Sequence, residues 1–152
     1  MPLDLSLDDG VKLDAKLRAR LRREVARMVK AAALHEGRTD LEVGLRLCTD
    51  AAIHELNKNY RGKNKPTDVL AFAQREAATA DSSLLGDIVI SIHTAKRQAK
   101  RGLYAELLHL ASHGLCHLLG YDHRDDEEER EMNERAAALR KEAARTGRVR
   151  AA

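Results

Sequence analysis

Residues 113–123 read His113-Gly114-Leu115-Cys116-His117-Leu118-Leu119-Gly120-Tyr121-Asp122-His123. His113 and His117 are four residues apart, so on a helix they lie about 40° apart around the axis and share one face. Gly120 can adopt the left-handed conformation that ends a helix, and the returning chain then presents His123. The segment therefore predicts a helix that supplies two imidazoles and a turn that supplies a third.

Three imidazoles that converge in this way indicate a metal site. Three neutral nitrogen ligands leave a fourth coordination position open, which is typical of catalytic rather than structural zinc. The alternative is that the histidines are unrelated, with His113 and His117 as ordinary core residues. Ligand spacing, helical context and the terminating Gly120 agree with one another and favour the metal site.

The residue after the first histidine limits the chemistry. Metzincin proteases have the same ligand spacing, but there a glutamate follows the first histidine and acts as the general base. Gly114 occupies that position here and has no side chain to accept a proton. This argues against peptide hydrolysis by that mechanism. It favours a reaction in which a metal and a positioned cation stabilise charge, with phosphodiester cleavage as the leading candidate.

Composition sets the class of protein. A chain of 152 residues suits a single core, and we expect residues 1–152 to form one domain. Lys and Arg number 27 against 24 Asp and Glu, a formal net charge of +3 that is compatible with nucleic-acid binding. Two cysteines make no disulfide framework, the acidic N-terminus is unlike a signal peptide, and no apolar run could span a bilayer. We therefore expect a cytoplasmic protein without a membrane partner.

Hydrophobic periodicity predicts an α+β chain. Alternating or β-branched segments predict four strands, at residues 3–7, 41–48, 67–73 and 84–92, the last one buried on both faces. Five helices are expected: one capped by Asp14, one over residues 51–59, one from about residue 94, the histidine helix at about 103–119 in the centre, and one from Asp125. Residues 60–66 and 74–83 are expected to connect strands and helices as loops.

Basic residues gather in three places. We expect the loop around Arg61 and Lys63 and the run Lys96–Arg101 to line a groove that leads to the metal. The first long helix also carries an Arg- and Lys-rich face. We interpret that face as solvated charge in preference to an RNA-contacting surface.

The histidine segment resembles the H-G-x-L-H-L-x-G-Y-D-H signature of the YbeY family, metal-dependent endoribonucleases of ribosomal RNA maturation. Upstream residues resemble the family's N-x-x-Y-R-x-x-x-x-P-T-D-V-L-S-F block and its G-D-I strand. The matching positions are Asn57, Tyr60–Lys63, Pro66–Phe72 and Gly86–Ile88. Cys116 and Ala71 depart from the family pattern, standing where Leu and Ser are usual.

The resemblance implies a fold, a site and partners. The fold would be zincin-like, with a mixed four-stranded sheet packed by helices. His113, His117 and His123 would bind one Zn²⁺ per chain, with Ni²⁺ as another possible metal, and Arg61 would be the functional arginine. The substrate would be single-stranded RNA, namely the 3′ end of small-subunit (16S) ribosomal RNA, during ribosome maturation and quality control. Partners would be the small ribosomal subunit and assembly proteins, with no DNA expected.

Several residues and functions stay open at this stage. His109, one turn before His113, is interpreted as a pocket residue rather than a fourth ligand, and Cys116 as a packing residue. Asp122 is expected to orient His123, whereas Asp68 and Asp87 are expected to be structural. Two alternatives to the endoribonuclease are a metalloprotease-like amide hydrolase and a non-catalytic ribosome-assembly factor with a structural metal.

Overall fold

The computed structural model describes residues 2–74 and 83–151, with side chains described as far as residue 144. The expected α+β class is confirmed, with four strands and five helices. In chain order they are β1 (Leu3–Leu7), α1 (Ala15–His35), β2 (Glu42–Cys48), α2 (Asp50–Arg61), β3 (Val69–Ala73), β4 (Leu84–Ser91), α3 (Ile92–Gln98), α4 (Leu103–Leu118) and α5 (Asp126–Ala151). Most of the loop expected at 74–83 lies outside the described residues.

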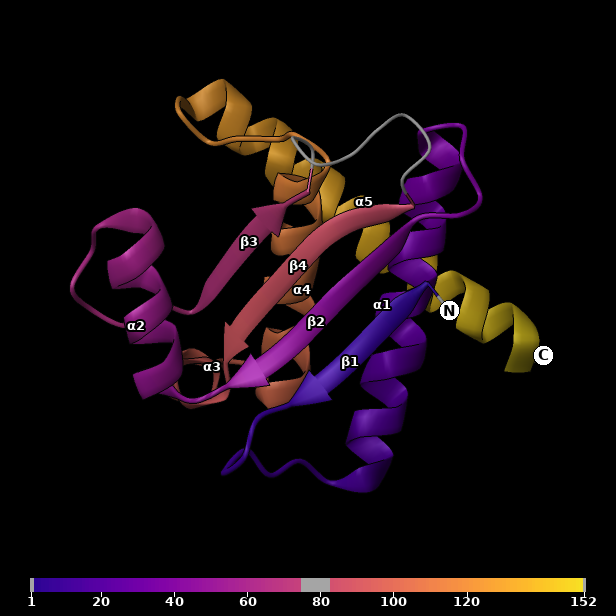
Figure 1. Cartoon of the computed structure of the whole chain (residues 1–152). Helices are drawn as coiled ribbons and strands as arrows, with labels where there is room; N and C mark the ends of the chain where they lie inside the picture. Colours follow the sequence, from indigo (N-terminus) through magenta and orange to yellow (C-terminus); the bar gives the residue numbers. More distant parts are fainter. Residues whose placement is uncertain (1, 75–82, 152) are drawn as a thin grey trace.

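The four strands form one mixed sheet in the order β1-β2-β4-β3. β1 and β2 are parallel, β2 and β4 are parallel, and β3 runs antiparallel to β4 along the edge. Figure 1 shows α1, α4 and α5 on the same face of this sheet, behind the strands. The mixed sheet agrees with the expectation from the family resemblance.

The register of the strands defines the main core. Leu5, Leu45 and Ile88 are paired across neighbouring strands, so their side chains point to the helix-covered face, where each is buried. The same face of β1 also carries Leu3, which is buried as well. The alternation of the sequence therefore translates directly into one buried and one open face of the sheet.

The opposite face is covered only in part. A small second cluster there consists of Cys48, Ile53, Leu70 and Val89, with Ile53 contributed by α2. Asp87 of β4 is exposed on that face, and Leu84 at the start of the strand is 39% exposed. The prediction that strand 84–92 is buried on both faces was therefore wrong for its first half, because α2 shields only the end of β4.

α4 lies centrally and comes very close to the sheet. Its buried residues include Leu107, Ala111, Leu115 and Leu118, which are at most 1% exposed. A Cβ added to Gly114 would lie 2.7 Å from Cγ2 of Ile88 on β4. Glycine at position 114 therefore permits the close approach of this helix to the strand below it.

Candidate metal centre

The end of α4 is built by a local sequence signal. Gly120 has φ of 104°, and its N–H donates to the carbonyl of His117, while the Tyr121 N–H donates to the carbonyl of Cys116. These two bonds form a Schellman motif, which satisfies the last carbonyls of the helix and reverses the chain. The turn predicted from Gly120 is confirmed, and it brings residues 121–123 back beside α4.

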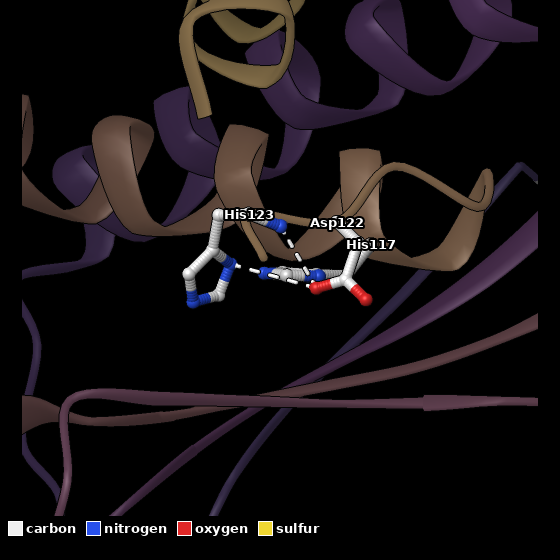
Figure 2. Close-up of side chains that lie close together, drawn as sticks. All are labelled: His117, Asp122 and His123. Atoms are coloured by element: carbon white, nitrogen blue, oxygen red, sulfur yellow. Dashed lines mark hydrogen bonds and ion pairs between the residues drawn. The ribbon is translucent and has the colours of Figure 1, made fainter. Parts of the chain in front are cut away.

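His117, Asp122 and His123 come together at this turn. One ligand atom from each lies within 4.8 Å of the other two, and among the described residues this is the group suited to hold a metal ion. The two imidazole centroids are 5.2 Å apart, and Figure 2 shows the three side chains converging. The Asp122 carboxylate also accepts the backbone N–H of His123 at 2.8 Å, which fixes the start of the returning segment.

His113 lies one helical turn before this group and outside it. Its ring is 4.3 Å from the ring of His109, centroid to centroid, and both residues line the same hollow as His117 and His123. Burial, reinforced by His109, lowers the pKa of His113 to about 4. Burial also lowers the pKa of His117, and the charge of a protonated His123 would lower it further. Both imidazoles are therefore neutral near pH 7, with lone pairs free for a metal.

The hollow that holds these histidines has a volume of about 720 Å³. Its walls come from α2, β3 and the segment before it, one face of α4, the turn after α4 and the start of α5. Arg61 and Lys63 line it from the α2 side, and Glu129 stands on the α5 side. The structure thus places every predicted site residue, Arg61 included, around one cavity.

The sequence predicts that Arg61 lies in a loop, and this prediction was wrong. In the structure Arg61 lies on the last turn of α2. Gly62, with φ of 70°, ends the helix one residue later. Asn57 is 2% exposed, and its side-chain amide donates to the carbonyl of Lys65 at 2.9 Å. That bond closes the basic segment after Arg61 against α2. No local pattern around Asn57 indicates a role for it, and its place in the family block is the one sequence signal that does.

Asp68 also belongs to the wall of the hollow. Its carboxylate accepts the N–H of Val69 at 2.7 Å and the side-chain amide of Gln98 at 2.9 Å. The same Gln98 amide donates to Glu106 of α4, so α3 ties the start of β3 to α4. Asp68 is therefore structural, as expected, but it also presents a fixed carboxylate to the cavity.

Cys116 is turned away from the site. It is fully buried, burial raises its pKa to about 11, and its thiol lies 3.9 Å from the carbonyl of Met132 on α5. A buried thiol of this kind packs as a small apolar side chain. The interpretation of Cys116 as a packing residue is confirmed.

The donor set determines what the site can do. Neutral imidazoles and a carboxylate are the ligands that divalent transition metals bind in proteins. A guanidinium in the same cavity can pair with two oxygens of a phosphate group at once. The combination suits an anionic substrate whose negative charge increases during the reaction.

Comparisons with known proteins agree with this chemistry. Residues 10–144 match the family model described as "Endoribonuclease YbeY". A protein named "Endoribonuclease YbeY" from Synechococcus sp. (strain RCC307) is 46% identical over 145 residues, covering 91% of this chain and 86% of its own length. One of the same name from Pelotomaculum thermopropionicum is 42% identical over 140 residues, covering 87% and 90%.

A solved structure is also similar. The solution structure of TM1509 from Thermotoga maritima superposes with a TM-score of 0.61 at 28% sequence identity, covering 97% of this chain and 93% of that one. No helix within the described residues is long and apolar enough to cross a membrane. With a family model matched over residues 10–144 and relatives matched over most of their length, this chain belongs to the YbeY family of endoribonucleases.

Proposed function

We propose that this chain is a metal-dependent endoribonuclease that cleaves single-stranded RNA, with residues 1–152 acting as one hydrolase domain. The observation that carries the proposal is the single cavity shared by the His117–Asp122–His123 group and Arg61. As the family resemblance implies, the substrate is the 3′ end of 16S ribosomal RNA in the cytoplasm. The partners are the small subunit and assembly proteins, not DNA or a membrane.

The metal we propose is one Zn²⁺ per chain, held by His113, His117 and His123, with Ni²⁺ as the alternative. The low pKa values of His113 and His117 support this choice, because a metal ligand must be unprotonated. Asp122 would orient His123, whose backbone N–H it already binds. When bound, the ion supplies a Lewis acid that polarises a phosphate oxygen or a water molecule.

Arg61 would perform the charge stabilisation that Gly114 cannot. A guanidinium stays charged at any working pH and can pair with two non-bridging phosphate oxygens. Negative charge on those oxygens is greatest in the pentavalent transition state, so the arginine stabilises that state more than the bound substrate. The last turn of α2 and the hydrogen bond from the Asn57 amide to the Lys65 carbonyl hold the arginine at the wall of the cavity.

The two other functions considered fit less well. An amide hydrolase of the metzincin type needs a carboxylate at position 114, where the Ile88 contact leaves no room for a side chain. A purely structural metal is typically enclosed by four protein ligands. His123 and Asp122 are instead about half exposed, which favours an accessible, catalytic ion.

The test compares four variants with the wild type for metal content, Tm and cleavage of a short single-stranded RNA. Arg61→Ala should keep the metal and the Tm but lose cleavage by about 10²-fold or more. Arg61→Lys should recover little, because an ammonium lacks the bidentate fork. His117→Ala should lose both the metal and the activity. Arg130→Ala, an exposed arginine of α5, is the matched control and should behave as wild type.

Two results would overturn the proposal. Cleavage by Arg61→Ala at the wild-type rate would remove the arginine from the mechanism. Equal metal content in His117→Ala and the wild type would place the ion elsewhere in the protein.

A further inference from the structure

α1 carries a line of basic residues that the proposed reaction does not use. Its members are spaced by four, three, four and three residues, so they lie on one side of the helix. We name this line the α1 stripe; it comprises Lys16, Arg20, Arg23, Arg27 and Lys30. All are exposed except Arg27, which is partly buried. The opposite side of α1 is buried in the core through Leu21, Val25, Met28 and Ala32.

The stripe opposes the stability of its own helix. Like charges three or four residues apart destabilise a helix, and the stripe contains four such pairs in succession. A solvated helix face normally mixes both signs of charge. Glu24 is the single acid between residues 15 and 35. A line of residues with only one sign of charge is typical of a surface that binds an anionic partner.

Within the described side chains, the stripe makes one ion pair. It joins Arg20 to Glu24 at 4.0 Å, beyond hydrogen-bonding range. Glu24 is also engaged by the Tyr104 hydroxyl, which donates to it at 2.8 Å. Among the described side chains, Lys16 and Arg23, the stripe residues on either side of Arg20, form no ion pair with a carboxylate.

Tyr104 of α4 packs against Arg20, near the N-terminal end of the stripe. The Arg20 guanidinium lies 4.1 Å above the centre of the Tyr104 ring, yet the side chain is 61% exposed. A stacked arginine has already lost part of its rotamer freedom, so binding a further group costs less entropy. Lys100 and Arg101, both exposed, come just before Tyr104 in the chain. They continue the basic surface toward Gln98, which contacts the cavity wall at Asp68.

The dimensions and surroundings of the stripe fit a nucleic-acid backbone. From Lys16 to Lys30 it extends about 21 Å along the helix, which is long enough to contact several successive phosphates of an extended single strand. A membrane-surface helix would need an apolar face free to insert into lipid, and in α1 that face is the protein core. On the other side of the cavity, the acidic start of α5 repels phosphate and so favours an RNA path toward α3 and α1.

We propose that the α1 stripe binds the phosphate backbone of the substrate RNA outside the cleavage cavity, so that long RNA is held at two places. This inference rests on the proposed endoribonuclease function. It replaces our sequence-based interpretation of the face as solvated charge. Short RNA that fills only the cavity does not reach the stripe. RNA long enough to pass around the N-terminal end of α4, where Tyr104 lies, binds to the stripe as well.

The test is the double variant Arg23→Glu, Lys30→Glu. The two introduced carboxylates would lie four residues before and three residues after Arg27, a favourable spacing, so the Tm should stay equal or rise slightly. Binding of a fluorescent 25-nucleotide unstructured RNA should weaken about 10-fold or more. The slope of log affinity against log salt should fall by about 1.4, or 0.7 for each lost phosphate contact. Binding and cleavage of a five-nucleotide RNA should not change.

The control is Lys12→Glu, Lys141→Glu, which makes the same change in net charge at exposed positions outside the stripe and away from the acidic start of α5. An equal loss of long-RNA affinity in this control, or no loss in the stripe variant, would overturn the proposal. So would loss of binding to vesicles containing phosphatidylserine with RNA binding unchanged. Failure of the wild type to cleave the five-nucleotide RNA would instead count against the proposed function, because that substrate does not reach the stripe.

Discussion

At the scale of single residues, Gly114 shows how one position serves both packing and chemistry. A methyl group there would lie 2.7 Å from Cγ2 and 3.1 Å from Cγ1 of the fully buried Ile88. The same missing side chain removes the glutamate that metzincin proteases use as a base. Gly114→Glu is consequently a poor test of the chemistry, because the carboxylate would be forced against the sheet before it could act on substrate.

Gly114→Ala isolates the packing effect. Alanine should gain about 1 kcal/mol of helix propensity but overpack the contact with Ile88 by about 1–3 kcal/mol. We expect a net loss of up to about 2 kcal/mol and a Tm lower by up to about 8 °C, measured by thermal unfolding. Ile88→Ala should reverse the effect in the double variant, because it removes the three atoms within 3.3 Å. Strictly additive free energies of unfolding would contradict the close contact.

The sequence identified the histidines far better than their surroundings. Helical periodicity and one glycine were enough to predict that His117 and His123 meet, because both signals are local. Asp122 was expected only to orient His123, yet its carboxylate lies among the possible ligands. Asp68 is held at the cavity wall by Gln98, thirty residues away in the chain. No local pattern predicts a contact of that kind.

At the scale of elements, α2 decides where Arg61 lies. The sequence from Tyr60 to Lys63 favours a loop, because Gly62 and the charged residues around it are typical of turns. The helix in fact continues to Arg61 and uses Gly62 as its left-handed end. Tyr60 packs edge-on against Phe72 of β3 with ring centroids 5.4 Å apart, which joins the end of α2 to the sheet.

Asn57→Ala should loosen this arrangement without touching the metal. The carbonyl of Lys65 would lose its side-chain donor, and the segment after Arg61 would no longer be held to α2. We expect a loss of about 1–3 kcal/mol in stability and slower RNA cleavage at unchanged metal content. Asn59→Ala, on the same helix but exposed, is the control and should match the wild type. Equal cleavage by both variants would show that the hydrogen bond between Asn57 and Lys65 does not position Arg61.

The order of the strands shows the limit of element-level prediction. Alternation and a β-branched run locate all four strands to within a few residues, because both patterns are local ones. It could not give the order β1-β2-β4-β3, since pairing of β2 with β4 depends on contacts between segments about 40 residues apart. Only the family resemblance indicated that the sheet is mixed.

At the scale of the whole molecule, the proposed metal site adds a second link between α4 and the turn that follows it, beside the packing of Leu119 and Tyr121 against the core. The turn after α4 is exposed at Asp122 and His123. Within the described part of the chain, these two residues make ion pairs, one backbone hydrogen bond and the ring contact between His123 and His117. An ion bound to α4 and to this turn would stabilise the folded state by mass action, since the unfolded chain has no preformed site. Stability should therefore depend on both metal and pH.

The pH dependence has a sign that can be worked out. The pKa of His113 is lowered from 6.5 to about 4 in the folded protein, and that of His117 is lowered too, both mainly by burial. Between pH 6.5 and 4 the unfolded chain therefore binds more protons than the metal-free folded protein, so its stability falls as pH decreases. The carboxyl groups with lowered pKa, such as Asp8 and Asp50, lose their contribution only below about pH 3.8, outside this window.

We expect the Tm of chelator-treated protein to fall steadily from pH 7 to pH 4.5, measured by scanning calorimetry at constant ionic strength. Metal-loaded protein should melt higher at pH 7. The difference should disappear toward pH 4.5, because protons compete with the ion for the same nitrogens. In His113→Gln the pH dependence of the metal-free protein should be weaker, since that side chain cannot be protonated. His35→Gln, which replaces an exposed histidine at the end of α1, is the matched control and should reproduce the wild-type curve. A flat Tm over this range, or a metal effect that persists at pH 4.5, would mean that these histidines neither titrate on unfolding nor hold the ion.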